Sequence, residues 1–207
     1  MPNLNFTIEG AEPLRFAASP HIGFTLRVSD APGMNIYNVI LQCQAHLDVT
    51  RRHYAANEQQ RLSDLFGPPS QWNETLRPMF WTNTNLIIPG FNGSTVVSLN
   101  VPCTFDFNVA VTKYFEGLDE GHIPVTFYFS GTVFFAGENG ELQVEKISWE
   151  KEASYDMPVQ VWREMMNAYY PNTAWLCLRR DAFDKLYAYK VRYGIPTFEQ
   201  ALETVVP

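Results

Sequence analysis

Residues 37–49 read YNVILQCQAHLDV, with an apolar residue at nearly every second position. The same alternation recurs in residues 97–111 (VSLNVPCTFDFNVAV) and 125–135 (VTFYFSGTVFF). A period of two indicates a β-strand with one buried and one solvated face. Strands of about 13 to 15 residues are far longer than the usual 5 to 6, so the sequence predicts a large antiparallel sheet covered on one side.

Residues 150–207 change to helical spacing. Val159, Trp162 and Met166 lie three and four residues apart, which predicts a helix that ends before Pro171. A second helix is predicted with a buried stripe of Phe183, Leu186, Tyr187 and Val191. Strands followed by helices are typical of an α+β protein. We therefore expect one domain over residues 1–207, a sheet backed by the helices of 150–207; the alternative is a β-sandwich with a helical C-terminal extension.

Composition excludes several classes of partner. The chain has a formal net charge of −7 and a pI near 5.1, and it lacks the basic stripe that a nucleic-acid groove needs. No apolar run approaches the length of a membrane span, and the N-terminus lacks the pattern of a signal peptide. We expect a cytoplasmic protein whose three distant cysteines stay reduced.

No residue pattern predicts catalysis, a cofactor or a metal site. The four histidines, His21, His46, His53 and His122, never occur at the spacing of zinc ligands. Cys43 and His46 could form a nucleophile and a base, but their spacing places them on opposite faces of one strand. The sequence therefore predicts a protein that is not an enzyme.

Two groups of residues are candidates for binding a partner. Gln42, Gln44 and His46 follow the polar face of the first long strand. That face could be solvated, could pair with a second copy or a partner chain, or could hold a ligand. The second group comprises Trp72, Met79, Phe80 and Trp81. These residues either fill the core or form an exposed apolar patch for a partner.

The whole chain resembles a bacterial family of uncharacterised function, of an actinobacterial type. The resemblance rests on Leu65-Phe66-Gly67, Thr75-Leu76-Arg77-Pro78, Val101-Pro102-Cys103-Thr104-Phe105-Asp106, Phe129-Ser130-Gly131-Thr132-Val133-Phe134-Phe135, Ala174-Trp175-Leu176 and Arg179-Arg180-Asp181-Ala182-Phe183-Asp184. Members of that family are often encoded near genes of uptake [NiFe]-hydrogenases. The resemblance implies an accessory role and no defined chemistry.

Both ends of the chain are also similar to export chaperones of the SecB type. The similarity lies in residues 22–28 and 36–41, in the helix at 159–169, and in residues 183–187. Such chaperones have a four-stranded antiparallel sheet backed by helices, form tetramers and hold unfolded clients. The chain departs from them by an inserted region, 51–123, in which we expect a helix at 55–66 and a β-hairpin about Asn92-Gly93.

These observations favour a non-catalytic, protein-binding accessory factor that acts like a chaperone or assists the assembly of a complex, such as a hydrogenase. Its partner would be a folded protein or a client polypeptide, and a homo-oligomer stays open. The alternatives are a small-ligand-binding protein or an unrecognised enzyme, and a structural subunit of a larger complex.

Overall fold

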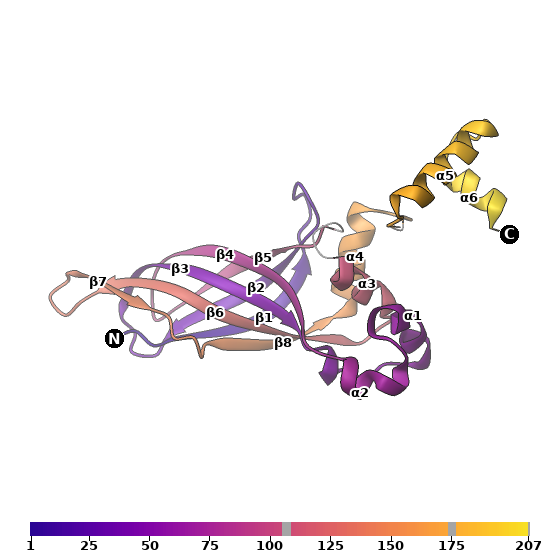
Figure 1. Ribbon diagram of the computed structural model, residues 1–207. Coiled ribbons are helices and arrows are strands. Elements are labelled where there is room, and N and C mark those ends of the chain that lie inside the picture. The colour runs from indigo at the N-terminus through magenta and orange to yellow at the C-terminus, as the bar shows by residue number, and fades with distance from the viewer. Residues whose placement is uncertain (105–108, 174–176, 207) are drawn as a thin grey trace. The chain divides into compact units, whose positions relative to one another are not determined.

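The computed structural model describes residues 1–104, 109–173 and 177–206 (Figure 1). Where the sequence suggested one domain, the chain divides into two compact units, Met1–Pro171 and Asn172–Pro207. The first unit holds all the described strands, four α-helices and two short 3₁₀ helices, and the second unit holds two α-helices. The two units are described separately below.

The strands of the first unit form two antiparallel sheets. Sheet A has the order β1-β2-β5, and sheet B has the order β4-β3-β6, with β7 and β8 pairing successive parts of β6. The bounds are β1 (Leu4–Pro13), β2 (His21–Asp30), β3 (Asn35–Leu47), β4 (Met79–Asn92), β5 (Ser94–Pro102), β6 (His122–Ala136), β7 (Leu142–Lys146) and β8 (Glu152–Pro158).

The inner faces of the two sheets pack on each other. The ring of Phe6 on β1 stacks on that of Phe129 on β6, with centroids 4.4 Å apart, and Phe24 on β2 meets Phe127 edge-on at 4.9 Å. Both pairs are buried. The predicted α+β class with long antiparallel strands is confirmed. Because sheet A covers the inner face of sheet B, the arrangement is that of the sandwich alternative.

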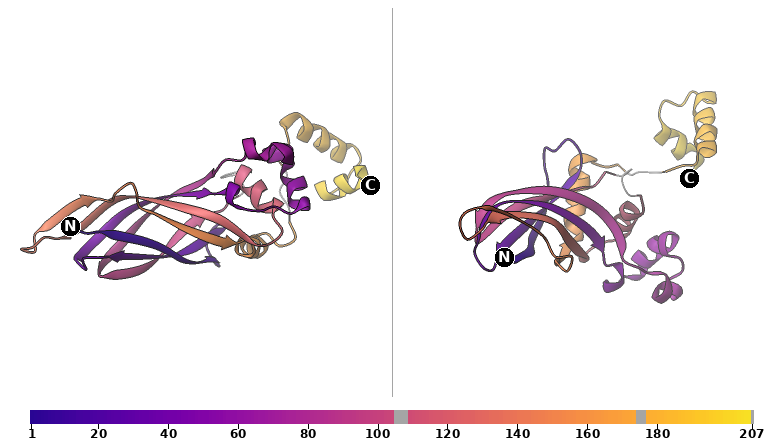
Figure 2. Two further views of the ribbon diagram at one scale, coloured as in Figure 1. Left: turned by 90° about the horizontal axis from the view of Figure 1, so that it is seen from below. Right: turned by 60° about the vertical axis from the view of Figure 1, so that its left-hand side comes forward.

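Short helices gather at one end of the sandwich (Figures 1 and 2). They are η1 (Val49–Arg51), α1 (Ala56–Phe66), η2 (Pro69–Gln71), α2 (Trp72–Thr75), α3 (Val109–Gly117) and α4 (Val159–Tyr169). The hydroxyl of Tyr169 on α4 donates a hydrogen bond to the carbonyl oxygen of Leu14 at 2.8 Å and accepts one from the N–H of Ala17 at 3.0 Å. These bonds fasten α4 to the loop after β1.

The strand predicted over 97–111 is wrong in its second half. Strand β5 ends at Pro102, and residues from Val109 onward form helix α3. Phe105 and Phe107 lie outside the described residues. Val111, Tyr114 and Phe115 are buried at helical spacing, so their burial on one face of a helix overrides the short alternation of Val109 and Val111.

The predicted hairpin about Asn92-Gly93 is also wrong, because β4 pairs with β3 in sheet B whereas β5 pairs with β2 in sheet A. Gly93, with a φ of 72°, turns the chain from one sheet into the other. The inserted region 51–123 thus supplies one strand to each sheet. Strand β8 was not predicted and occupies the start of the region 150–207, whereas helix α4 covers Val159–Tyr169, where the first C-terminal helix was predicted.

The second unit consists of helices α5 (Arg180–Arg192) and α6 (Phe198–Val205). The hydroxyl of Thr197 caps α6 by accepting a hydrogen bond from the N–H of Gln200 at 3.2 Å. The ring of Phe198 contacts Phe183 and Tyr187 of α5, with centroids 5.5 and 6.4 Å apart. In the described ranges, no helix is long and apolar enough to cross a membrane.

We expect Phe24→Ala to lower the free energy of unfolding by about 3–5 kcal/mol, because it leaves a cavity where Phe24 touches Phe127 and Trp81. Urea unfolding followed by circular dichroism measures the change. The matched control is Phe16→Ala, since Phe16 is fully exposed and its loss should change little. Equal effects of the two substitutions would contradict the sandwich core.

Candidate functional site

The outer face of sheet B is built around β3, which lies between β4 and β6. The ladder places Gln42 opposite Asn85 on β4 and Ser130 on β6, and Gln44 opposite Asn83 on β4. Side chains alternate along each strand, so these five point to the same side while Leu41 and Cys43 point into the core. The register therefore joins the predicted Gln42 and Gln44 to amide groups of a neighbouring strand.

We name this surface the amide face. It comprises seven exposed residues, Ile40, Gln42, Gln44, Asn83, Asn85, Ile87 and Ser130. A hollow of about 250 Å³ lies on this face, and five members of the amide face line it: Gln42, Gln44, Asn83, Asn85 and Ser130. Cys43 and Thr84, which lie between them along β3 and β4, complete the lining. No hydrogen bond within the described residues uses the four side-chain amides. Each amide thus keeps its donors and its acceptor available to a partner.

The third predicted residue of this face, His46, lies beside aromatic rings. Its imidazole meets Phe80 and Tyr128 edge-on, with ring centroids 5.6 and 5.3 Å away. Phe80 and Tyr128 are about half exposed. The aromatic cluster extends the amide face toward the start of β4. His46 and Phe80, which were predicted in two separate groups of partner-binding residues, therefore lie on one surface.

The remaining predicted residues do not join this surface. Trp81 is buried between the sheets, where it contacts Phe24 and Phe115, and Trp72 is buried against Tyr54. Met79 is partly buried against the core. The aromatic-rich segment therefore fills the core with Trp72, Met79 and Trp81 and exposes Phe80.

Cys43 and His46 lie on opposite sides of β3, as their spacing predicted. The thiol of Cys43 is buried, and burial raises its pKa to about 12. A thiol with such a pKa stays protonated at neutral pH and is a poor nucleophile.

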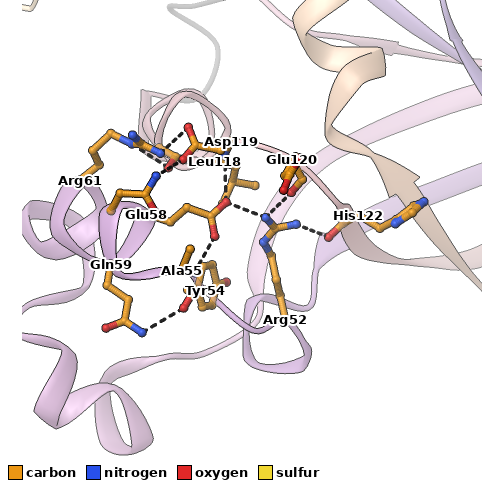
Figure 3. A network of polar contacts seen from close by, with 12 residues as sticks. Arg52, Tyr54, Ala55, Glu58, Gln59, Arg61, Leu118, Asp119, Glu120 and His122 are labelled. Carbon is orange, nitrogen blue, oxygen red and sulfur yellow. Dashed lines mark hydrogen bonds and ion pairs between the residues drawn. The ribbon is translucent and has the colours of Figure 1, made fainter.

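A second polar site lies at the helical end of the first unit (Figure 3). A hollow of about 530 Å³ opens between η1, the start of α1, the start of β6 and β8. Its lining includes Arg51, His53, Asn57, His122 and Asp156, with the ion pair of Arg52 and Glu58 among them. Within the described part of the chain, no group of three or more His, Cys, Asp or Glu side chains could hold a metal ion.

The ion pair of this site is itself buried. The side chains of Arg52 and Glu58 are only 7% and 4% exposed, and their N–O distance is 2.7 Å. The Arg52 guanidinium also donates hydrogen bonds to the carbonyl oxygens of His122 at 2.5 Å and Glu120 at 2.6 Å. Only its Nε is buried without a partner. The ion pair and hydrogen bonds of Arg52 therefore hold the start of β6 against the segment after β3.

The carboxylate of Glu58 is equally occupied. Burial disfavours its charged form, but hydrogen bonds from the backbone N–H groups of Asp119 and Ala55, both 2.9 Å, and the Arg52 guanidinium favour it. The net result is a pKa below the ordinary value for Glu58. Because the acceptors are used within the protein, the pair is a structural clamp rather than an open binding group.

A neighbouring cluster ties three helices together around Asp119. Its carboxylate forms ion pairs with Arg61 of α1 at 2.6 Å and Arg163 of α4 at 3.7 Å. Arg61 also donates to the carbonyl oxygen of Gly117, at the end of α3, at 3.0 Å. The hydrogen bond and charge of Arg61 are the main reason that the pKa of Asp119 is lowered. These contacts hold the helical end of the first unit in one arrangement.

The comparisons with known proteins identify a family. The family described as "Family of unknown function (DUF6084)" matches residues 1–207. The chain belongs to this family. No curated protein sequence matches it.

Two solved structures are similar to parts of the chain. One is the CARDB domain of the PF1109 protein from Pyrococcus furiosus in complex with di-metal ions, with 11% identity, a TM-score of 0.30, and coverage of 75% of this chain and 91% of that one. The other is a beta-glucosidase from Kluyveromyces marxianus, with 10% identity, a TM-score of 0.24, and coverage of 75% and 15%. Neither likeness is close enough to indicate a function.

Removing the charge of the clamp should destabilise the protein. We expect Glu58→Gln to lower the free energy of unfolding by about 3–5 kcal/mol, because it leaves the buried Arg52 unpaired. Urea unfolding at pH 7 measures the loss. The control Glu120→Gln changes an exposed side chain on the same rim and should cost little. A loss that is equal for both variants would contradict the clamp.

The clamp should also depend on pH. Since the pKa of Glu58 is lower in the folded than in the unfolded state, its contribution is complete above the unfolded pKa and is lost as the pH falls through the folded pKa. The difference in unfolding free energy between the native chain and Glu58→Gln should therefore shrink from about pH 6 to about pH 3. A difference that stays constant over this range would show that the carboxylate charge contributes nothing.

Proposed function

We propose that the protein is a non-catalytic, protein-binding accessory factor that docks a partner on the amide face. The observation that carries the proposal is the exposure of apolar residues on a solvated sheet face. Ile40 and Ile87 are paired across β3 and β4, and their side chains are 47% and 71% exposed. Around them lie side-chain amides with unused donors and acceptors. Exposed apolar area surrounded by polar groups is typical of a protein interface.

The absence of charge on the amide face supports the same proposal. None of its seven residues carries a formal charge, although charged residues make up 18% of the chain. The outer face of sheet A differs, because Glu9 and Arg27 form an exposed ion pair there. Cores of protein interfaces are depleted of charged residues, since burying an unpaired charge costs free energy.

A folded partner fits this face better than an unfolded client does. The apolar contribution is two isoleucines among amides, with Phe80 and Tyr128 to one side. Such a face offers hydrogen bonds at defined positions, whereas a holdase needs a continuous apolar groove. The resemblance to a family encoded near uptake [NiFe]-hydrogenase genes suggests a component of that system as the partner. We propose assembly of such a complex as the context in which the amide face acts.

The test is capture of a partner by tagged protein in its native cell, read by mass spectrometry. We expect Ile87→Arg to reduce recovery of the same partner by at least about tenfold, because the interface would bury an unpaired charge. The matched control is Val96→Arg, which places the same side chain at a half-exposed position on the outer face of sheet A. Recovery should be unchanged in the control.

Two results would overturn the proposal. One is equal loss of the partner in Ile87→Arg and Val96→Arg, which would remove the assignment to the amide face. The other is a purified chain that captures no partner and protects no unfolded client from aggregation, while a small molecule raises its melting temperature. That outcome would favour the alternative of a small-ligand-binding protein.

A further inference from the structure

Of the helical stripe predicted to be buried in the second unit, Leu186 is half-buried, whereas Phe183, Tyr187 and Val191 are exposed. Phe183, Tyr187 and Val191 are 39%, 52% and 61% exposed, and no residue of α5 is buried. Within the unit, Phe198 of α6 contacts Phe183 and Tyr187 of the stripe, and Val191 is left uncovered. Side chains at such spacing line one face of a helix. Within the second unit, the stripe therefore has the pattern of a packing surface that α6 covers only in part.

The unit is also too small to be stable on its own core. It spans residues 172–207, and Ala201 is the one buried residue in its described helices. Units below about 40 residues usually need disulfides, metals or oligomerisation. The unit has a single cysteine, Cys177, so no disulfide can form within it. Association with another surface can supply the stability that this core lacks.

The stripe is symmetric about Tyr187. Phe183 precedes it by four residues and Val191 follows it by four. If a second copy of α5 packs antiparallel, Tyr187 meets its own counterpart, and Phe183 of each copy meets Val191 of the other. This is the self-complementary pattern of a two-fold interface, in which each contact occurs twice.

The charges on α5 favour the antiparallel direction. Near its start, Arg179 pairs with Asp181 and Arg180 pairs with Asp184. After Asp184 the helix carries no carboxylate and three cations, Lys185, Lys190 and Arg192, of which the last two lie in its second half. Parallel packing would place two such basic halves side by side. Antiparallel packing instead places each basic half beside the acid-containing half of the other copy, within about one Debye length of its carboxylates.

We propose that α5 and α6 form a homodimerisation element, in which α5 packs antiparallel on α5 of a second copy about Tyr187. The interface is separate from the amide face and does not depend on what the amide face binds. The chain would then have two binding surfaces, one for a second copy of the chain and one for another protein.

Sedimentation velocity of the full-length chain tests the proposal. The native chain should sediment with twice the 23.7 kDa mass of one copy. Tyr187→Asp should raise the dimer dissociation constant at least about 100-fold, because the two-fold axis buries the new charge twice. The matched control is Tyr193→Asp, at the end of the same helix but off the stripe, and should leave the dimer intact. Far-ultraviolet circular dichroism checks that both variants stay folded.

Disulfide trapping tests the direction of packing. In a Cys177→Ser background, Tyr187→Cys should form an intermolecular disulfide when diamide oxidises the two thiols and is itself reduced. Asp181→Cys should not, because antiparallel packing about residue 187 separates the two 181 positions by about 18 Å along the axis, beyond the reach of a disulfide. Parallel packing would trap both variants.

Three results would overturn the proposal. A native chain that stays monomeric at about 100 µM, a concentration far above most dimer dissociation constants, excludes the dimer. A dimer that persists in Tyr187→Asp lies on another surface. Trapping through Asp181→Cys excludes the antiparallel direction. Ile87→Arg should leave the dimer unchanged, so failure of the amide-face proposal and failure of this one can be told apart.

Discussion

Strand β3 must bury every second side chain between two sheets, and the rest of the first unit follows from this constraint. Val39, Leu41, Cys43 and Ala45 all point inward and are almost completely buried. Because β3 is central in sheet B, its position sets those of β4 and β6. A shift of one residue would place Gln42 and Gln44 in the core, which would bury amides without partners. The register that buries the inward residues of β3 therefore also places Gln42 and Gln44 on the amide face.

The helical end depends on a different kind of interaction. Arg52 and Glu58 lie close in sequence, but their hydrogen bonds reach residues 119–122, which lead into β6. Removing two charges from water is unfavourable unless other groups satisfy them. Here the carboxylate accepts two backbone N–H groups, and the guanidinium donates to two carbonyl oxygens. The pair is thus better understood as a clamp that joins α1 to the start of β6 than as the floor of a ligand site.

The sequence was most informative where one periodicity runs through a whole element. Strands β3 and β6 were predicted because their apolar residues recur at every second position. Helix α1 was predicted because its apolar residues recur at helical spacing. Helix α3 was not, because Val109 and Val111 continue the alternation of the preceding strand, and its helical spacing appears only with Tyr114 and Phe115. Strand β8 alternates Ala153, Tyr155 and Met157, but its small and charged residues made the pattern inconspicuous.

The candidate site was predictable only in part for a physical reason. Gln42, Gln44 and His46 share one strand face, and a single strand is enough to show that. Asn83 and Asn85 join them only through the pairing of β3 with β4, which no local pattern specifies. The turn at Asn92-Gly93 has the residues of a hairpin, yet the flanking strands enter different sheets. Local turn chemistry sets the bend and tertiary packing sets the partner.

Dimerisation through α5 would affect binding at the amide face by doubling the number of amide faces in one particle. This effect needs no contact between the two proposed surfaces. A face with two exposed isoleucines and a few amides offers a small apolar area, so a single copy would bind a partner weakly. A dimer through α5 would carry two amide faces, and a partner that is itself repeated in a complex could engage both. The second engagement is then intramolecular, which raises the apparent affinity without any new contact. Weak faces that are joined in pairs would suit the proposed accessory role, in which the protein binds during assembly and leaves afterwards.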